Sequence, residues 1–108
     1  MANGRDTRQI KRMRNEILVA LKVLYPGALQ ADQLLRSVLV LFPDLEFDHF
    51  RHDLIYLSEK KYIERVITDT ERDLEAGATP WRRRWFRLTT AGMEIADHCV
   101  RDPALDES

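Results

Sequence analysis

The sequence predicts an α+β protein with a three-helix body, a β-hairpin and a C-terminal helix. Three successive segments carry apolar residues at spacings of three and four, the periodicity of helices that bury one face. Two short segments rich in β-branched and aromatic residues follow, separated by a polar stretch, which is typical of a hairpin. The chain has 108 residues, a length that fits one compact domain.

Composition and charge narrow the class of protein. Hydrophobic residues make up 44% of the chain, enough for a core, and charged residues make up 32%. The formal net charge is −1, so any attraction to nucleic acid must come from local patches. The single cysteine, Cys99, allows no internal disulfide, and the longest apolar run, Val38–Phe42, is far too short to span a membrane. The N-terminus lacks the apolar core of a signal peptide, so we expect a cytoplasmic protein with no membrane partner.

The first helix is expected from Thr7 to Tyr25, where the Tyr25-Pro26-Gly27 sequence ends it. Its apolar stripe consists of Ile10, Met13, Ile17, Leu21 and Leu24. Further apolar residues make the second half of this helix apolar nearly all round; they are Leu18, Val19 and Val23. This pattern predicts either deep burial or a surface shared with a partner.

Two more helices complete the predicted body. The second is expected from about Ala31 to Phe42, preceded by one short strand in GALQ and ended by Pro43. The third is expected from about Glu46 to Lys60, with acidic residues in its first turn and lysines at its end, which suits the helix dipole. Its buried stripe would be Phe47, Phe50, Leu54 and Leu57.

The hairpin and the last helix follow. Residues 62–68 and 81–88 are expected to be strands joined by a polar turn over 69–80. Thr89 or Thr90 can cap a helix that runs to about Val100. We assign residues 1–101 to one domain with a basic N-terminal segment, and residues 102–108 to an acidic flexible tail.

Two stretches carry a resemblance to the winged helix-turn-helix superfamily. The stretch HFRHDLIYLSEKKYIERV, residues 49–66, is similar to the recognition helix and first wing strand of that superfamily. The stretch WFRLTTAGMEIAD, residues 85–97, is similar to the Tyr-x-Leu-Thr-x-x-Gly segment of PadR-like and MarR-like regulators. The resemblance implies a winged helix-turn-helix fold, with a β-hairpin wing, that binds DNA. The chain departs from the pattern after the third helix, where Lys60-Lys61 stands in place of the usual glycine.

An arginine-rich stretch begins the second strand of the predicted hairpin. PWRRRWFRLTTAG, residues 80–92, interleaves four arginines with three aromatic residues. Strand alternation would turn Phe86 and Leu88 toward the core and make the distal hairpin basic on both faces. The arginines there are Arg82, Arg83 and Arg84. They could lie along a phosphate backbone or enter a minor groove. The alternative is a self-paired hairpin in which carboxylates opposite neutralise them; these are Asp69, Glu71, Asp73 and Glu75.

Two further surfaces are candidates for DNA contact. On the third helix, Arg51 and His52 are the best candidates, with His49 as another. Asp48 would repel phosphates, so this face is poorly basic and an ordinary solvated face is the alternative. Arg12 belongs to a basic N-terminal segment that can add phosphate contacts or form a solvated first turn.

No catalytic or metal site is expected. His49, His52 and Asp53 have the spacing of a metal pair, but metal sites need three or four ligands, and a hydrogen bond within the helix also explains the spacing. The chain has no glycine-rich phosphate loop, no paired cysteine motif and no nucleophile elbow. We therefore expect a protein that is not an enzyme and uses no cofactor.

The sequence leaves two functions open. The first is a transcriptional regulator that binds double-stranded DNA as a homodimer, with Met93, Cys99 and Val100 in the dimer interface. The second is a protein–protein interaction module of the same fold without DNA binding, which the near-neutral charge favours. The small size also suits a bacterial or phage accessory protein, by analogy of fold alone.

Overall fold

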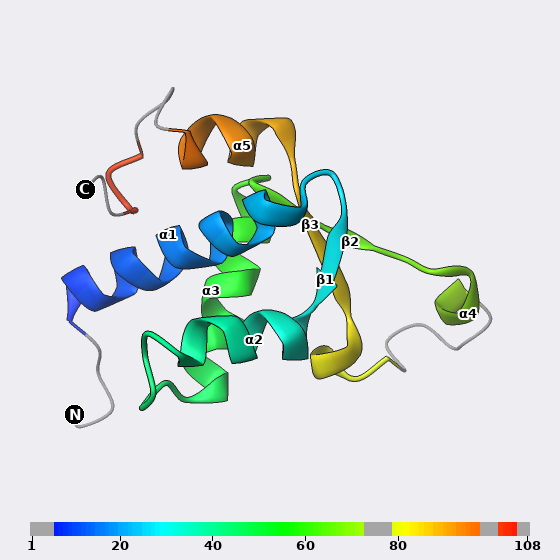
Figure 1. The fold of residues 1–108 in the computed structure, drawn as a ribbon, viewed down its shortest axis with the longest axis horizontal. Coiled ribbons are helices and arrows are strands. Elements are labelled where there is room, and N and C mark those ends of the chain that lie inside the picture. The colour runs from blue at the N-terminus through cyan, green and yellow to red at the C-terminus, as the bar shows by residue number, and fades with distance from the viewer. Residues whose placement is uncertain (1–5, 73–78, 98–101, 106–108) are drawn as a thin grey trace.

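The computed structural model describes residues 6–72, 79–97 and 102–105. Helix α1 crosses the middle of the molecule, with α5 on one side of it and α2 on the other, and the sheet closes one end (Figure 1). The expected α+β class is confirmed, and the expected helices and strands occur in the expected order, but the segment 69–80 expected to be a turn begins with helix α4. In chain order the elements are α1 (Thr7–Leu24), β1 (Ala28–Gln30), α2 (Ala31–Leu39), α3 (Phe47–Glu59), β2 (Ile63–Val66), α4 (Asp69–Arg72), the 3₁₀ turn η1 (Trp81–Arg83), β3 (Trp85–Leu88) and α5 (Thr90–Ala96).

Helix α1 is fixed at its start by a reciprocal cap. The Asp6 side chain accepts a hydrogen bond from the Gln9 amide, and the Gln9 side chain accepts one from the Asp6 amide. This pairing satisfies two of the amides that a helix start leaves without partners. The helix ends at Leu24, one residue before the predicted end.

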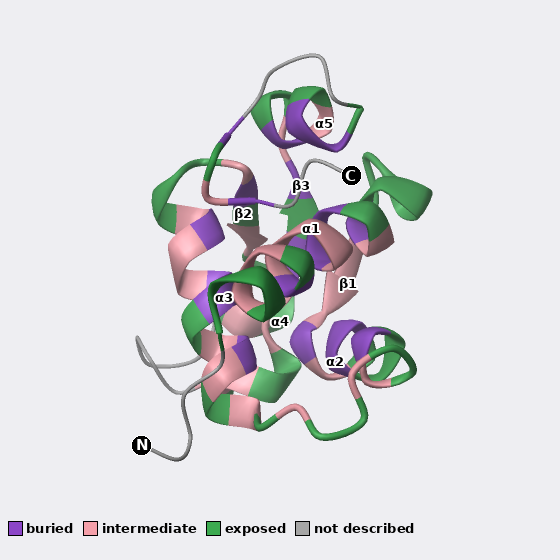
Figure 2. Cartoon of the chain, turned by 90° about the vertical axis from the view of Figure 1, so that its left-hand side faces the viewer, coloured by how far each residue is buried: buried purple, intermediate pink, exposed green. Residues whose placement is uncertain are grey.

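The core lies between the three helices of the body, α5 and the sheet. Figure 2 shows buried stretches on α1, α2, α3 and α5, alternating with exposed ones. Each large apolar side chain in this core stabilises the fold by roughly 1.5–3 kcal/mol. The largest fully buried side chains include Phe50, Phe86, Met13, Ile17, Leu21, Leu34, Leu54 and Leu57.

The sheet is antiparallel, with strand order β1-β3-β2. Phe86 of β3 lies opposite Leu29 on one side and Arg65 on the other. Phe86 and Leu88 face the core while Arg87 is exposed, so the predicted alternation holds over β3.

The predicted second strand is too long. We expected a strand over residues 81–88, but residues 81–83 form η1 and only Trp85–Leu88 are extended. The Trp81 ring stacks on Phe86 with ring centroids 6.0 Å apart. That stacking bends the chain back toward the body, because a straight strand would carry Trp81 away from Phe86.

The end of the chain also differs from the prediction. We expected residues 102–108 to be a flexible tail, but Leu105 is buried in the core and Asp102 accepts a hydrogen bond from Tyr62. An apolar side chain four residues from the end gains more from burial than an acidic tail composition suggests. Residues 106–108 lie outside the described residues.

Candidate functional site

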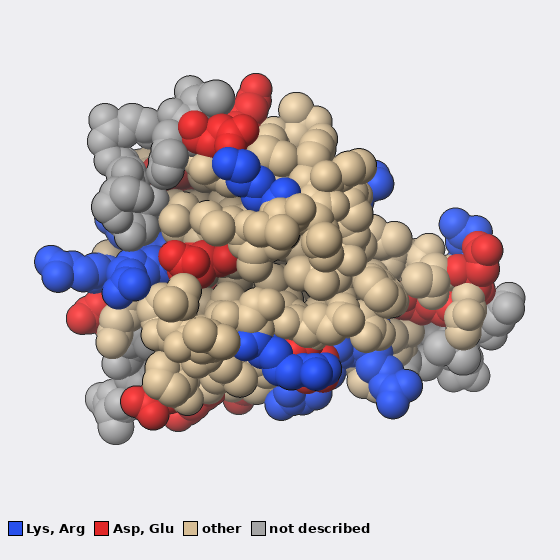
Figure 3. Space-filling view, in the orientation of Figure 1, with Lys and Arg blue, Asp and Glu red and all other residues tan. Residues whose placement is uncertain are grey.

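The projecting end of the hairpin does not carry the arginines predicted for it. Figure 1 shows α4 at this end, away from the helical body. Here Asp69 pairs with Arg72 over 2.9 Å, and Glu71 pairs with Arg65 of β2. In Figure 3 acidic and basic side chains lie side by side at this tip. The described part of the tip therefore has no excess of positive charge.

The predicted arginines instead lie in the part of the hairpin loop that leads into β3, and this part folds against α2. The Ala31 amide at the start of α2 donates to the Arg84 carbonyl at 2.8 Å, and the Gln30 side chain donates to the Arg83 carbonyl at 3.3 Å. These two bonds hold η1 beside the start of α2. The expectation that these guanidinium groups project with the distal hairpin is wrong, because the Gln30 side chain and the Ala31 amide bind this segment to the body.

Arg84 is used for packing. Its guanidinium lies over the Trp81 ring, 4.5 Å from the centroid, and donates to the Thr79 carbonyl at 3.1 Å. Its charge also adds to the burial that lowers the pKa of Arg65. Of the three predicted arginines, Arg84 is therefore the least available to a ligand.

Arg82 and Arg83 form a basic surface with a residue that we did not predict. Arg82 lies over the Phe47 ring at the start of α3, 4.2 Å from the centroid. It also approaches Asp32 of α2 at 3.4 Å, and Arg36 binds the other carboxylate oxygen of Asp32 at 2.8 Å. We call Arg36, Arg82 and Arg83 the arginine cluster. Figure 3 shows basic side chains gathered over α2 and η1, with acidic atoms between them.

The arginine cluster borders an open groove. The groove has a volume of about 350 Å³ and is lined by Gln30, Asp32, Arg82 and Arg83. The spacing of Asp32 and Arg36, four apart on one helix, is a readable sign of an ion pair. The sequence holds no sign that Arg82, fifty positions later, joins the same carboxylate.

The outer face of α3 carries few positive charges, as predicted. His52 is exposed, while His49 and Arg51 are half-buried. Arg51 pairs with Asp48 at 3.5 Å, one turn earlier on the helix. Arg82 covers Phe47, the first residue of α3. The arginine cluster therefore borders the N-terminal part of α3, where Arg51 also lies.

The basic residues of α1 have separate roles. Arg12 lies over the Phe42 ring, 5.3 Å from the centroid, and is exposed. Arg14 binds the buried Asp53 of α3 at 3.2 Å and stacks on the Tyr56 ring at 3.7 Å. Arg14 therefore fixes α3 against α1 through the Asp53 carboxylate and the Tyr56 ring.

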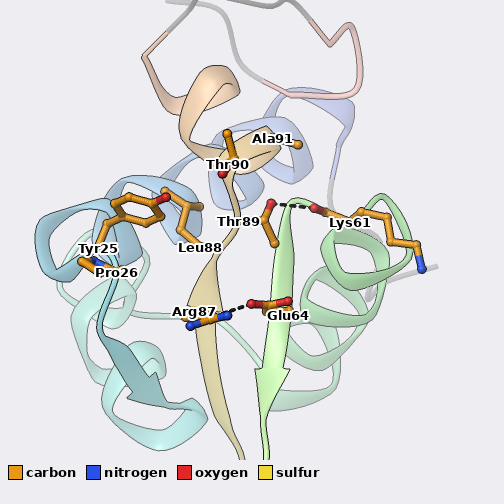
Figure 4. A pocket seen from close by; sticks show the side chains of 9 residues that line it. All are labelled: Tyr25, Pro26, Lys61, Glu64, Arg87, Leu88, Thr89, Thr90 and Ala91. Carbon is orange, nitrogen blue, oxygen red and sulfur yellow. Dashed lines mark hydrogen bonds and ion pairs between the residues drawn. The ribbon is translucent and has the colours of Figure 1, made fainter.

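The far end of β3 is a polar joint between α3, β2 and α5, which we call the junction. Thr89 caps α5 by accepting from the Gly92 amide at 3.0 Å, and its hydroxyl donates to the Lys61 carbonyl at 2.6 Å. Figure 4 shows Thr89 reaching toward Lys61, with the Arg87–Glu64 ion pair below. Lys61, Thr89, Arg87 and Glu64 are among the residues that line a groove of about 440 Å³.

Lys61 and Gly92 give the junction its backbone geometry. Lys61 has φ 67°, the left-handed conformation that a glycine adopts most easily. The Tyr62 amide donates back to the Leu57 carbonyl at 3.0 Å, which closes the end of α3. A Cβ on Gly92 would overlap the Tyr62 carbonyl. The Thr-x-x-Gly pattern is therefore explained by packing alone.

Tyr62 and Asp102 form a coupled pair behind the junction. The Tyr62 hydroxyl donates to Asp102 at 2.6 Å. Burial, together with the Asp102 carboxylate, raises the pKa of Tyr62 to about 12. Burial alone would raise the pKa of Asp102, but hydrogen bonds from Tyr62 and the Ala104 amide and the charge of Lys60 hold it below its ordinary value. The stability that Asp102 contributes is thus present at neutral pH and is lost as the pH falls through its lowered pKa.

The remaining expectations concern the dimer interface, metal binding and membrane-spanning helices. Met93 is half-buried and packs against the core of its own chain, while Cys99 and Val100 lie outside the described residues. Within the described ranges, no group of three metal-ligating side chains is close enough to hold an ion. None of the described helices has the length and apolar character needed to cross a membrane.

No family of known proteins, no curated protein and no solved structure matches this chain. Its function must therefore be argued from its own side chains.

Proposed function

We propose that this protein is a winged-helix DNA-binding protein, of the kind that regulates transcription. The order of α1, α2 and α3, followed by the β2–β3 hairpin with β1 as third strand, supports a winged helix. In that arrangement α2 and α3 are the helix-turn-helix and α3 is the recognition helix.

The observation that carries the proposal is the arginine cluster. Arg36, Arg82 and Arg83 come from two distant segments and meet beside the starts of α2 and α3. A duplex whose major groove receives α3 would bring its phosphate backbone past these positions. Arginine suits this contact because its planar guanidinium donates several hydrogen bonds to phosphate oxygens.

The cluster changes how DNA contact is expected to occur. Most contacts would come from η1 and from α2, with Arg51 and His52 on α3 as the nearest groups for base edges. The acidic Asp48 and Glu59 on α3 would limit affinity, so binding should depend strongly on backbone contacts.

The test is duplex binding measured by fluorescence anisotropy at two salt concentrations. Wild-type binding should weaken with salt, with a slope of roughly −0.9 for each phosphate neutralised. Changing Arg82 and Arg83 together to alanine should weaken binding at least about tenfold, since each charge-assisted hydrogen bond is worth roughly 1.5–3 kcal/mol. Arg84 is left unchanged because it packs on Trp81.

A matched control is available at the tip of the hairpin. Arg72→Ala removes an exposed arginine that pairs with Asp69 in α4, and it should leave affinity within about twofold. Absence of any salt-sensitive duplex binding would reject the proposed function. Equal losses in the Arg72 variant and the double variant would place the interface elsewhere.

A protein–protein interaction module remains a second candidate because of one exposed apolar turn. Val40 is 81% exposed and Leu41 is 54% exposed in the connection between α2 and α3. Adjacent exposed aliphatic residues are typical of a protein contact rather than a phosphate contact. Under this alternative, Val40→Ser with Leu41→Ser would abolish partner binding that is insensitive to salt, while the arginine variants would not.

A further inference from the structure

Asp32 lies at the centre of the arginine cluster and uses both of its carboxylate oxygens. One oxygen accepts from Arg36 at 2.8 Å, and the other approaches Arg82 at 3.4 Å. The two arginines come from different segments, so Asp32 joins the start of α2 to η1. Two guanidinium groups around one anion is also the arrangement that binds a phosphate.

We propose that Asp32 occupies the position of a backbone phosphate, and that DNA binds the arginine cluster by displacing this carboxylate. The inference rests on the proposed function and deepens it. It assigns the groove beside Gln30 and Arg83 to one phosphodiester of a duplex. It also makes Asp32 a built-in limit on the affinity of that site.

The exposure of the three side chains permits this exchange. Arg36 is 70% exposed, Arg82 is 53% exposed and Asp32 is 38% exposed. Ion pairs that face water are weak, and the groove of about 350 Å³ is open to an incoming ligand. No backbone needs to move, because a change of side-chain rotamer frees both guanidinium groups.

Phosphate has a general advantage over the internal carboxylate. A duplex brings a row of phosphates and releases condensed counterions when they are neutralised, whereas Asp32 offers one charge and releases none. The cluster holds three arginines against this single carboxylate within the described residues. The surplus positive charge attracts the duplex, and Asp32 weakens that attraction.

The test is Asp32→Asn, which removes the charge and keeps the shape of the side chain. Duplex affinity should rise roughly three- to tenfold at low salt, and the gain should shrink at high salt. The salt slope should also steepen, because no carboxylate then offsets the positive charge of the cluster. Asp32→Ser gives a second variant, and thermal unfolding verifies that both are folded.

The matched control is Asp69→Asn, which removes another carboxylate paired with an arginine but at the tip of the hairpin. A similar gain in this control would mean that only net charge matters, and it would overturn the inference. Unchanged or weaker duplex binding by Asp32→Asn would overturn it too.

Two arms separate the possible failures. If Arg82 and Arg83 support duplex binding but Asp32→Asn does not strengthen it, the inference fails and the proposed function stands. If wild type and Asp32→Asn both lack salt-sensitive duplex binding, both fail. Calorimetric titration with inorganic phosphate should show no measurable binding; tight binding of free phosphate would assign the groove to a small anion and overturn the inference.

Discussion

The two ends of strand β3 are built for different purposes. After the C-terminal end of β3 the chain enters the junction, where Thr89 and Gly92 lie within hydrogen-bonding or van der Waals distance of the Tyr62 backbone. Before its start lies η1, where Arg82 and Arg83 face water beside α2. The two regions are joined by only four residues of strand.

The difference separates residues that the fold requires from residues that it only tolerates. At the junction, backbone atoms approach so closely that side-chain identity follows from geometry. At η1 the aromatic Trp81 packs on Phe86, whereas Arg82 and Arg83 are exposed and the contacts of Arg82 with Phe47 and Asp32 lie at the surface. A surface that packing does not require is the better candidate for function.

The largest expected effect is at Gly92. Gly92→Ala would place a methyl group against the Tyr62 carbonyl and within 2.8 Å of Leu88 Cδ1. Neither the strand nor the end of α3 can retreat without breaking the cap, so we expect a loss of about 3 kcal/mol in the free energy of unfolding. Urea denaturation measures it. Ala91→Gly, at the exposed neighbouring position, should cost only about 0.5–1 kcal/mol. Equal losses at the two positions would contradict the close approach.

The second prediction tests the Tyr62–Asp102 bond behind the junction. Tyr62→Phe should cost about 1–2 kcal/mol at neutral pH, because it removes a hydrogen bond to a carboxylate. The pKa of Tyr62 is raised to about 12 in the folded chain, against an ordinary value of 10.0 for tyrosine. Its contribution is therefore complete below pH 10 and is lost as the pH rises toward 12.

Wild type and Tyr62→Phe should thus converge in stability at alkaline pH. Urea denaturation at several pH values between 7 and 11 measures the gap, and other alkaline titrations cancel in the difference. Tyr25→Phe, in the exposed turn after α1, should show no such trend. A gap that stays constant with pH would argue against the raised pKa.

Periodicity was sufficient to predict α1, α2, α3 and α5 and their order, but not α4, which lies where a polar turn was expected. The spacing of Met13, Ile17 and Leu21 is helical under any packing, and Phe86 and Leu88 alternate as a strand must. The sequence of residues 81–84 also reads as the start of this strand, since Trp81 and three arginines continue directly into Trp85–Leu88. Its actual bend depends on Trp81 stacking on Phe86 and on bonds to residues about fifty positions away.

The candidate site could be predicted only in part for the same reason. Arg82 and Arg83 stood out in the sequence, but their partner Asp32 and their neighbour Arg36 did not, because a contact between distant segments leaves no local pattern. The buried Leu105 escaped prediction because its neighbours are acidic. For the arginine cluster and for Leu105 alike, a contact with a distant segment determines the local structure, and the neighbouring residues in the sequence do not indicate that contact.

The smallest expected effect has the opposite sign and concerns Lys61, where the chain departs from the usual glycine. A left-handed backbone costs an L-residue roughly 1–2 kcal/mol, whereas glycine adopts it freely but loses more conformational entropy on folding. Lys61→Gly should therefore stabilise the protein by about 0.5–1 kcal/mol in urea denaturation. Lys60→Gly removes the same charge at a right-handed position with φ −76° and should destabilise it. If both variants lose stability, the left-handed backbone at Lys61 costs no measurable free energy. The backbone geometry of the junction would then not determine the residue type at this position.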